Sequence, residues 1–306
     1  MFVARFFNKD NLFQRFGGWT SDIMEKKKLV FKDEEKNIRS KPMTITKSPL
    51  LTEHILFQAT SIYIDLIYLK KAETECINQF KLFENKLDLK IDKIRFHSPY
   101  LLDLSIRISP ILNSIRILQN LVIRLLKYEL NKMTLPNSMH KYIKNKNHQE
   151  QISNEINNII NKYWENSGEK VKQYRDINQH HYPLVRETYL QIKPEIKVLV
   201  LLPDNPDKKA YKDALFNEQI NAIDYVLSAF YKFHDLLESL SSELGYEPKP
   251  FQQELRIGRF IENINETDLG TIGLIIYNST RARKINFMNG GFIQDELFLK
   301  KKDEIN

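Results

Sequence analysis

The sequence predicts a mainly α protein, a bundle of four to five long helices with an N-terminal extension and a small β appendage. Apolar residues recur at three- and four-residue steps over long stretches, as amphipathic helices require. Strand-like alternation is confined to short segments. The 306 residues hold only nine glycines and eleven prolines, which excludes a collagen-like or low-complexity chain. We therefore divide the chain into an extension (1–48), a helical bundle (49–246) and an appendage (247–306).

The first two helices are predicted between residues 51 and about 130. The first runs from 51 to about 89 without a helix breaker. The second has two possible starts, Ser98-Pro99 and Ser109-Pro110, because serine can cap a helix and proline suits its first position. A continuous apolar stripe follows the second pair, at Ile111, Ile115, Leu118, Val122 and Leu125.

A third helix is predicted from about residue 152, after a polar connection over 133–148 that contains Pro136. Its apolar stripe keeps a helical phase as far as His181. Pro183 lacks a backbone N–H and clashes with the preceding turn, so the helix must kink or stop there.

The remaining elements alternate in type. Residues 188–202 have the pattern of a short β-hairpin, and a fourth helix is predicted from about 209 to 244, ending at Gly245. Strand composition returns over 271–277 and 282–288. The Asn289-Gly290-Gly291 sequence that follows is a turn signal, so we expect a β-hairpin in the appendage.

Composition places the chain among cytoplasmic proteins. A single cysteine excludes an internal disulfide, and we see neither a signal peptide nor an apolar run long enough to cross a membrane. The net charge is +7, but residues 1–48 hold 11 Lys and Arg against 6 Asp and Glu, so the rest is nearly neutral. The charge therefore points to the extension as an electrostatic contact for RNA or another polyanion.

The residues with the clearest chemical signature lie near the end of the third predicted helix, at Arg175, Asp176 and His180. Asp176 and His180 are four residues apart, so the carboxylate could hold the imidazole in one tautomer. Histidine accepts a proton near neutral pH, and arginine can stabilise the charge that develops on a phosphorane. These are the groups that RNA cleavage by its own 2′-hydroxyl needs, and no metal is required.

This Arg-polar-x-x-x-His element resembles the motif of the HEPN superfamily (higher eukaryotes and prokaryotes nucleotide-binding domains) over roughly residues 50–246. Of the 13 arginines, only Arg175 has Asp, Asn or His next and His five positions on. The resemblance implies a metal-independent endoribonuclease that dimerises so that two motifs line one cleft, and a role as a toxin or antiviral-defence effector. Arg175 and His180 would be catalytic, with Asp176 beside them, and an antitoxin or defence-complex protein is an expected partner.

Several alternatives stay open at this point. Arg175 could be a surface residue that pairs with Asp176 or Glu169, and His181 fits a core or interface position better than a catalytic one. Asn178 and Gln179, with His181, are candidate substrate ligands but could simply be solvated. The chain could instead be a non-catalytic bundle that binds a nucleotide or protein, or a dimerisation module that uses 247–306 as its contact.

No cofactor is expected, because the glycines form no phosphate-binding loop. No metal is expected either, since His140 and His148 lack neighbouring ligands at metal-binding spacing. A run of basic residues ahead of the motif could follow an RNA backbone or be an ordinary solvated connection. These residues are Arg124, Lys127, Lys132, Lys141, Lys144 and Lys146.

Overall fold

The computed structural model describes residues 12–23, 47–84, 92–95, 98–185, 187–249, 283–288 and 291–296. It is mainly helical with small antiparallel sheets, which confirms the predicted class. The chain divides into two compact units, residues 15–248 and residues 1–14 with 249–306, and each is described by itself.

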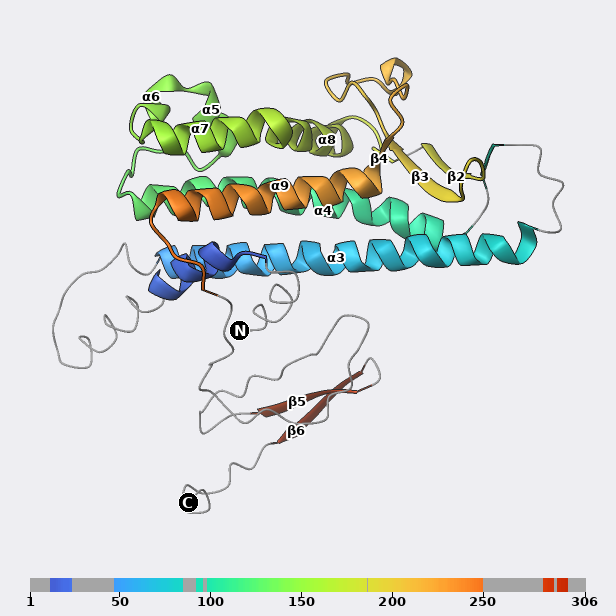
Figure 1. Cartoon of the computed structure of the whole chain (residues 1–306), viewed down its shortest axis with the longest axis horizontal. Helices are drawn as coiled ribbons and strands as arrows, with labels where there is room; N and C mark the ends of the chain where they lie inside the picture. Colours follow the sequence, from blue (N-terminus) through green and yellow to red (C-terminus); the bar gives the residue numbers. More distant parts are fainter. Residues whose placement is uncertain are drawn as a thin grey trace. The chain divides into compact units, whose positions relative to one another are not determined.

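Long helices build the larger unit (Figure 1). Helix α3 (Lys47–Glu84) lies along α4 (Pro99–Glu129), and α9 (Ala222–Glu243) packs on α4 as well. Their contacts bury an apolar core in which most of the predicted stripe residues are inaccessible to solvent. Helix α4 contributes the largest share, including Leu104, Ile108, Ile111, Leu112, Ile115, Leu118, Leu121, Val122, Ile123, Leu125 and Leu126. The long helices thus pack around α4, which contacts α3, α8 (Glu169–His180) and α9.

Helix α4 begins at the first of the two Ser-Pro pairs. The hydroxyl of Ser98 accepts a hydrogen bond from the Tyr100 N–H at 3.2 Å and donates one to Gln79 at 2.6 Å. The second proline, Pro110, lies inside the helix on its exposed side. Because the carbonyl of Ile106 that Pro110 leaves unpaired is on an exposed residue, water can satisfy it and the helix continues.

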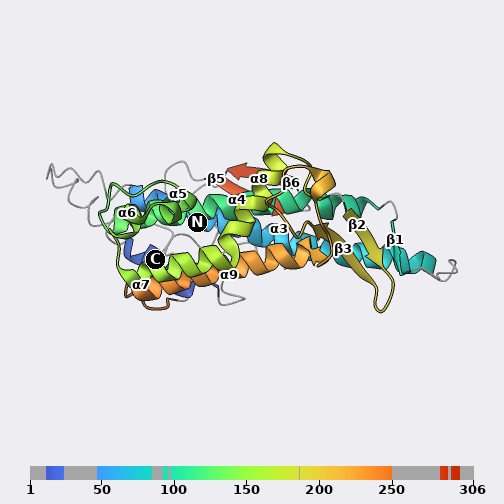
Figure 2. The same cartoon turned by 90° about the horizontal axis from the view of Figure 1, so that it is seen from above.

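The third predicted helix consists of three consecutive parts: α7 (Asn154–Tyr163), a π-helical turn η1 (Trp164–Gly168) and α8 (Glu169–His180). Helix α7 packs against α9, whereas α8 crosses to α4 (Figure 2). Each π-helical turn adds a residue to the helical repeat and so shifts the faces that follow. The turn therefore lies where the helix changes its partner. As predicted, the helix stops before Pro183.

Two parts of the predicted secondary structure are wrong. Residues 133–148 are not a bare connection, because they include the short helix α5 (Met139–Lys144) and most of α6 (Lys146–Gln149). The buried side chains of Met139 and Tyr142 hold α5, and the Tyr142 hydroxyl bonds Asn157 of α7. A polar sequence with two well-placed apolar anchors was therefore sufficient to form helix.

The fourth predicted helix starts too early, since α9 begins only at Ala222. Residues 203–219 form a loop with a short 3₁₀ turn, η2 (Tyr211–Asp213). The carboxylate of Asp204 accepts hydrogen bonds from the N–H groups of Asn217 and Glu218 at 2.6 and 3.1 Å. These side-chain bonds compete with helix formation, and Asn221 then caps α9.

A four-stranded antiparallel sheet lies at one end of the long helices (Figure 1). The predicted hairpin over 188–202 is confirmed, with Thr188 opposite Val200. The cis Lys193–Pro194 peptide lies in its connection. In order, the strands are β1 (Lys93–Ile94), β2 (Glu187–Gln191), β3 (Lys197–Leu202) and β4 (Ile220–Asn221).

Part of the predicted N-terminal extension belongs to the larger unit. Residues 15–23 are helical, and the carboxylate of Glu238 in α9 accepts hydrogen bonds from the N–H groups of Arg15 and Phe16 at 2.9 and 3.1 Å. The indole of Trp19 stacks on Tyr246, with ring centroids 5.4 Å apart. This segment therefore contributes to the core of the unit.

In the smaller unit, β5 (Arg283–Met288) pairs with β6 (Gly291–Glu296) in antiparallel register, which confirms a hairpin around the predicted turn. The other predicted strand, 271–277, lies outside the described residues. No helix in the described ranges is both long enough and apolar enough to span a membrane.

Candidate functional site

Helix α8 carries the predicted motif on a firmly anchored backbone. Val171, Tyr174 and Ile177 are buried, and the Tyr174 hydroxyl donates a 2.8 Å hydrogen bond to the carbonyl of Pro203. These contacts fix the rotation of α8. Because Arg175 and Asp176 follow the buried Tyr174, both lie at the edge of the buried face and are about 30% exposed.

Arg175 and Asp176 are paired with each other and with Lys172. The guanidinium of Arg175 donates through Nη1 to Oδ1 of Asp176 at 2.8 Å, and the Lys172 ammonium donates to Oδ2 at 2.7 Å. Burial by itself raises the pKa of the Asp176 carboxyl, but these two hydrogen bonds and charges outweigh it and lower the pKa below its ordinary value. Asp176 is therefore an ionised carboxylate with both oxygens engaged.

His180 is the last residue of α8 and its side chain is exposed. Its ring makes an edge contact with the ring of His181, with centroids 6.3 Å apart. The expected hydrogen bond from the His180 imidazole to the Asp176 carboxylate is absent among the described residues. Arg175 and His180 are separated by about 140° around the helix axis. One chain therefore does not place these two side chains side by side.

The candidate substrate ligands have varied positions. Asn178 accepts a hydrogen bond from the Leu184 N–H at 3.2 Å, which supports the turn after α8, and Gln179 donates to Asn113 of α4 at 3.3 Å. Their role as RNA ligands stays a prediction. His181 is exposed at the C-terminal cap of α8, so the expectation of a core histidine is wrong and an interface position stays open.

A second arginine, Arg116 of α4, lies within electrostatic range of Arg175 and was not singled out from the sequence. Its side chain is 8% exposed and donates to Gln119 at 2.8 Å and to the Ser138 hydroxyl at 3.3 Å. The guanidinium also lies 5.8 Å from the ring of Trp164, and the ring of His140 lies 5.9 Å from the same indole. Arg116 and His140 thus both lie against the indole of Trp164.

Gln119 connects Arg116 to the π-helical turn. This fully buried amide accepts from Arg116 and donates to the Tyr163 hydroxyl at 3.1 Å and to the carbonyl of Gly168 at 3.2 Å. The sequence contained a signal for this pair, because Arg116 and Gln119 are in helical phase with the buried Leu112 and Ile123. Two polar residues within a buried stripe indicate a specific polar site.

This arrangement lowers the pKa of two groups, Arg116 and His140. Burial lowers the pKa of the Arg116 guanidinium, and the charge of Arg175 lowers it further. Burial also lowers the pKa of the His140 imidazole, with added repulsion from Lys172, Lys144 and Arg116. Asp176 opposes both shifts. We call Arg116, His140, Lys172 and Arg175 the basic cluster.

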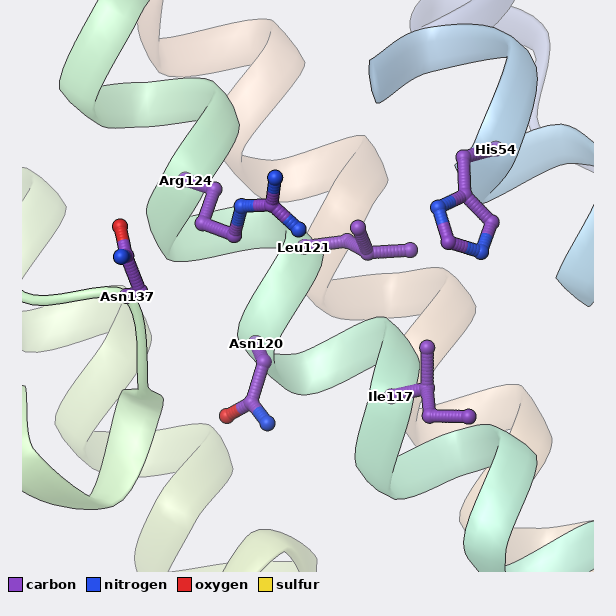
Figure 3. Close-up of a pocket in the computed structure, with 6 residues that line it drawn as sticks. All are labelled: His54, Ile117, Asn120, Leu121, Arg124 and Asn137. Carbon is purple, nitrogen blue, oxygen red and sulfur yellow. The ribbon is translucent and has the colours of Figure 1, made fainter. Parts of the chain in front are cut away.

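A shallow cleft of about 260 Å³ lies next along α4 (Figure 3). His54 of α3 and Arg124 of α4 approach it from opposite sides, over apolar side chains between them. The amides of Asn120 and Asn137 complete the lining, so the cleft combines hydrogen-bonding groups with apolar side chains. The lining residues are His54, Ile117, Asn120, Leu121, Arg124 and Asn137.

Among the described residues, no three His, Cys, Asp or Glu side chains gather as metal ligands would. Comparisons of the chain with protein-family models, with curated proteins and with solved structures found no match.

Proposed function

We propose that the protein is a metal-independent endoribonuclease of the HEPN type that acts as a toxin or antiviral-defence effector. One observation carries the proposal: helix α8 presents a guanidinium held in place by Asp176 and, at its exposed end, an accessible imidazole. These are the two groups that cleavage by an internal nucleophile needs.

In the proposed reaction the imidazole of His180 takes the proton from a ribose 2′-hydroxyl, whose oxygen attacks the adjacent phosphorus. The bond from phosphorus to the 5′-oxygen breaks, and the imidazolium returns the proton to that oxygen. Arg175 stabilises the negative charge of the phosphorane. The products are a 2′,3′-cyclic phosphate and a 5′-hydroxyl.

A dimer would complete this site. Because Arg175 and His180 point in directions about 140° apart on one helix, a second α8 is needed to bring an arginine opposite a histidine. We therefore propose a homodimer formed through α8, with the two motifs in one cleft. An antitoxin or defence-complex protein that covers this cleft would restrain the activity.

The test is cleavage of structured RNA by the purified full chain in excess EDTA. We expect wild-type protein to produce 2′,3′-cyclic phosphate ends and His180→Ala to lose the activity by at least about a hundredfold, the usual contribution of a general base. His181→Ala is the matched control because it removes the neighbouring exposed imidazole. Equal cleavage by wild type and His180→Ala would show that the catalytic assignment is wrong.

A second candidate is a non-catalytic bundle that binds a nucleotide or a protein partner. The engagement of both Asp176 oxygens favours it, because no described carboxylate then orients His180. This candidate predicts RNA or nucleotide binding without new RNA ends in the same assay.

A further inference from the structure

The side chain of Arg116 carries a charge that its hydrogen bonds do not neutralise. Both of its acceptors, Gln119 and Ser138, are neutral, and it takes part in no salt bridge with a described residue. A buried charge without a counter-charge is costly, and proteins normally supply one. Arg116 therefore has hydrogen-bonded support, but no carboxylate among the described residues is bonded to it.

The neighbouring residues add to this imbalance. Three permanent cations, Arg116, Lys172 and Arg175, surround the single carboxylate of Asp176, which is already bonded to two of them. His140 lies within the influence of the same charges. The basic cluster and Asp176 together therefore hold a net charge of about +2 before any protonation of the histidine.

Arg175 has an unused donor in this region. Its Nη1 binds Asp176, whereas its Nε is buried and bonds no described residue. Buried donors are almost always satisfied in native structures. A small adjustment of the Arg175 side chain that opens Nε to a ligand oxygen would satisfy this donor, and the guanidinium edge formed by Nε and an Nη can then bind two oxygens of one phosphate.

The support behind the cluster is rigid. The indole of Trp164 lies beside Arg116 and His140, and Gln119 ties Arg116 to the π-helical turn. Rigid placement lowers the entropy lost on binding. Lys172 and Arg175 are about a quarter to a third exposed, so solvent and ligands can reach the cluster.

We propose that the basic cluster of Arg116, His140, Lys172 and Arg175 binds a phosphate group of a nucleic acid. Arg116 and His140 extend the site beyond the motif helix, onto α4 and α5. The inference rests on the proposed function only in naming RNA as the source of the phosphate. The binding itself does not depend on His180 or on cleavage.

The experiment titrates the full chain with inorganic phosphate. Trp164 reports binding through its fluorescence in a Trp19→Phe background, because these are the two tryptophans of the chain. We expect a saturable change in emission and a rise in the unfolding temperature, neither of which sodium chloride reproduces at equal ionic strength. A response that does not saturate, or that sodium chloride reproduces, would contradict the proposal.

Arg116→Met is the decisive variant. We expect it to weaken phosphate binding by at least about tenfold, since it removes a charged donor of the site. Lys172→Met, at a more exposed position, should act in the same direction and serves if Arg116→Met does not fold. Lys197→Met, which removes an exposed lysine paired with Asp224, should bind as the wild type does. Wild-type affinity in both cluster variants would overturn the proposal.

Competition identifies the source of the phosphate. Oligonucleotides with 2′-O-methyl riboses lack the 2′-hydroxyl nucleophile and cannot be cleaved by this reaction, so their binding is measured separately from catalysis. Displacement of phosphate by oligonucleotides with and without a 5′-phosphate supports backbone recognition, and displacement by the phosphorylated form alone supports a terminal phosphate. Displacement by neither contradicts a nucleic-acid ligand. Saturable phosphate binding by a chain that produces no new RNA ends would contradict the nuclease proposal and leave this one standing, so the two failures are distinguishable.

Discussion

Lys172 donates a 2.7 Å hydrogen bond to the carboxylate of Asp176, one turn further along α8. The carboxylate therefore faces the beginning of the helix, where Arg175 also binds it, and not His180 one turn later. Equal spacing in the sequence allowed either pairing, since both partners are four residues away. Asp176 thus acts on the arginine of the motif and helps to balance the basic cluster.

Asp176→Asn tests this role through the pH dependence of stability. The pKa of Asp176 is lowered in the folded protein, so its stabilising effect is complete above the unfolded pKa of about 3.9 and is lost as pH falls through the folded pKa. We expect the variant to be less stable by about 1–2 kcal/mol at pH 7, with a difference that shrinks below about pH 4. Urea unfolding across this range measures it.

Asp207→Asn is the control, because Asp207 pairs with Lys208 on the surface and is 58% exposed. Exposed pairs contribute little, so we expect a change within about 0.5 kcal/mol at every pH. An Asp176→Asn penalty that persisted at pH 3 would indicate lost packing and not a lost charge.

The sequence identified the motif helix but not the chemistry behind it. Arg175, Asp176 and His180 could be found because their spacing lies within one element. Arg116 and His140 come from α4 and α5, and only tertiary packing brings them to α8. Local spacing also could not decide which neighbour Asp176 would bind, because that depends on how the burial of α8 rotates the helix.

Complementation between inactive variants tests the proposed dimer. In a composite site, a heterodimer of Arg175→Ala and His180→Ala protomers has one site with both mutations and one with neither. We expect mixed, co-refolded variants to regain up to about a quarter of the wild-type cleavage, because half of the dimers are mixed and each has one intact site. If the mixture is as inactive as either variant alone, the composite site is wrong, and Arg175 and His180 of one active site belong to the same protomer.

Gly168→Ala tests the packing of the π-helical turn. A Cβ atom at residue 168 would lie 2.9 Å from Cε3 of Trp164 and 3.1 Å from Cε1 of Tyr163. In an ordinary helix this change stabilises, whereas here we expect a loss of about 1–3 kcal/mol in the free energy of unfolding. Asn166→Ala, at an exposed position of the same turn, should change it by less than about 0.5 kcal/mol. Chemical denaturation of both variants measures whether the free energy of unfolding falls or rises.

Helix periodicity predicted α3, α4 and the course of α7 and α8 because each buries one continuous stripe. It failed over 209–221, where apolar residues at suitable steps belong to a loop held by Asp204 and Asn205 and to the short strand β4. It also missed the helix over 15–23, which depends on a distant carboxylate for its first N–H groups. In both cases side-chain hydrogen bonds from elsewhere in the chain, not local periodicity, decide the backbone.

Glu238→Ala tests that distant contact. Glu238 accepts hydrogen bonds from the first N–H groups of the 15–23 helix, so its removal leaves two donors without their partner. Its negative charge at the N-terminal end also interacts favourably with the helix dipole. We expect a loss of about 1–2 kcal/mol in stability and a change in Trp19 fluorescence as its stacking on Tyr246 loosens. Glu238→Gln, which keeps one acceptor oxygen, should lose less. Unchanged Trp19 emission in Glu238→Ala would show that the aromatic contacts hold this helix without the carboxylate.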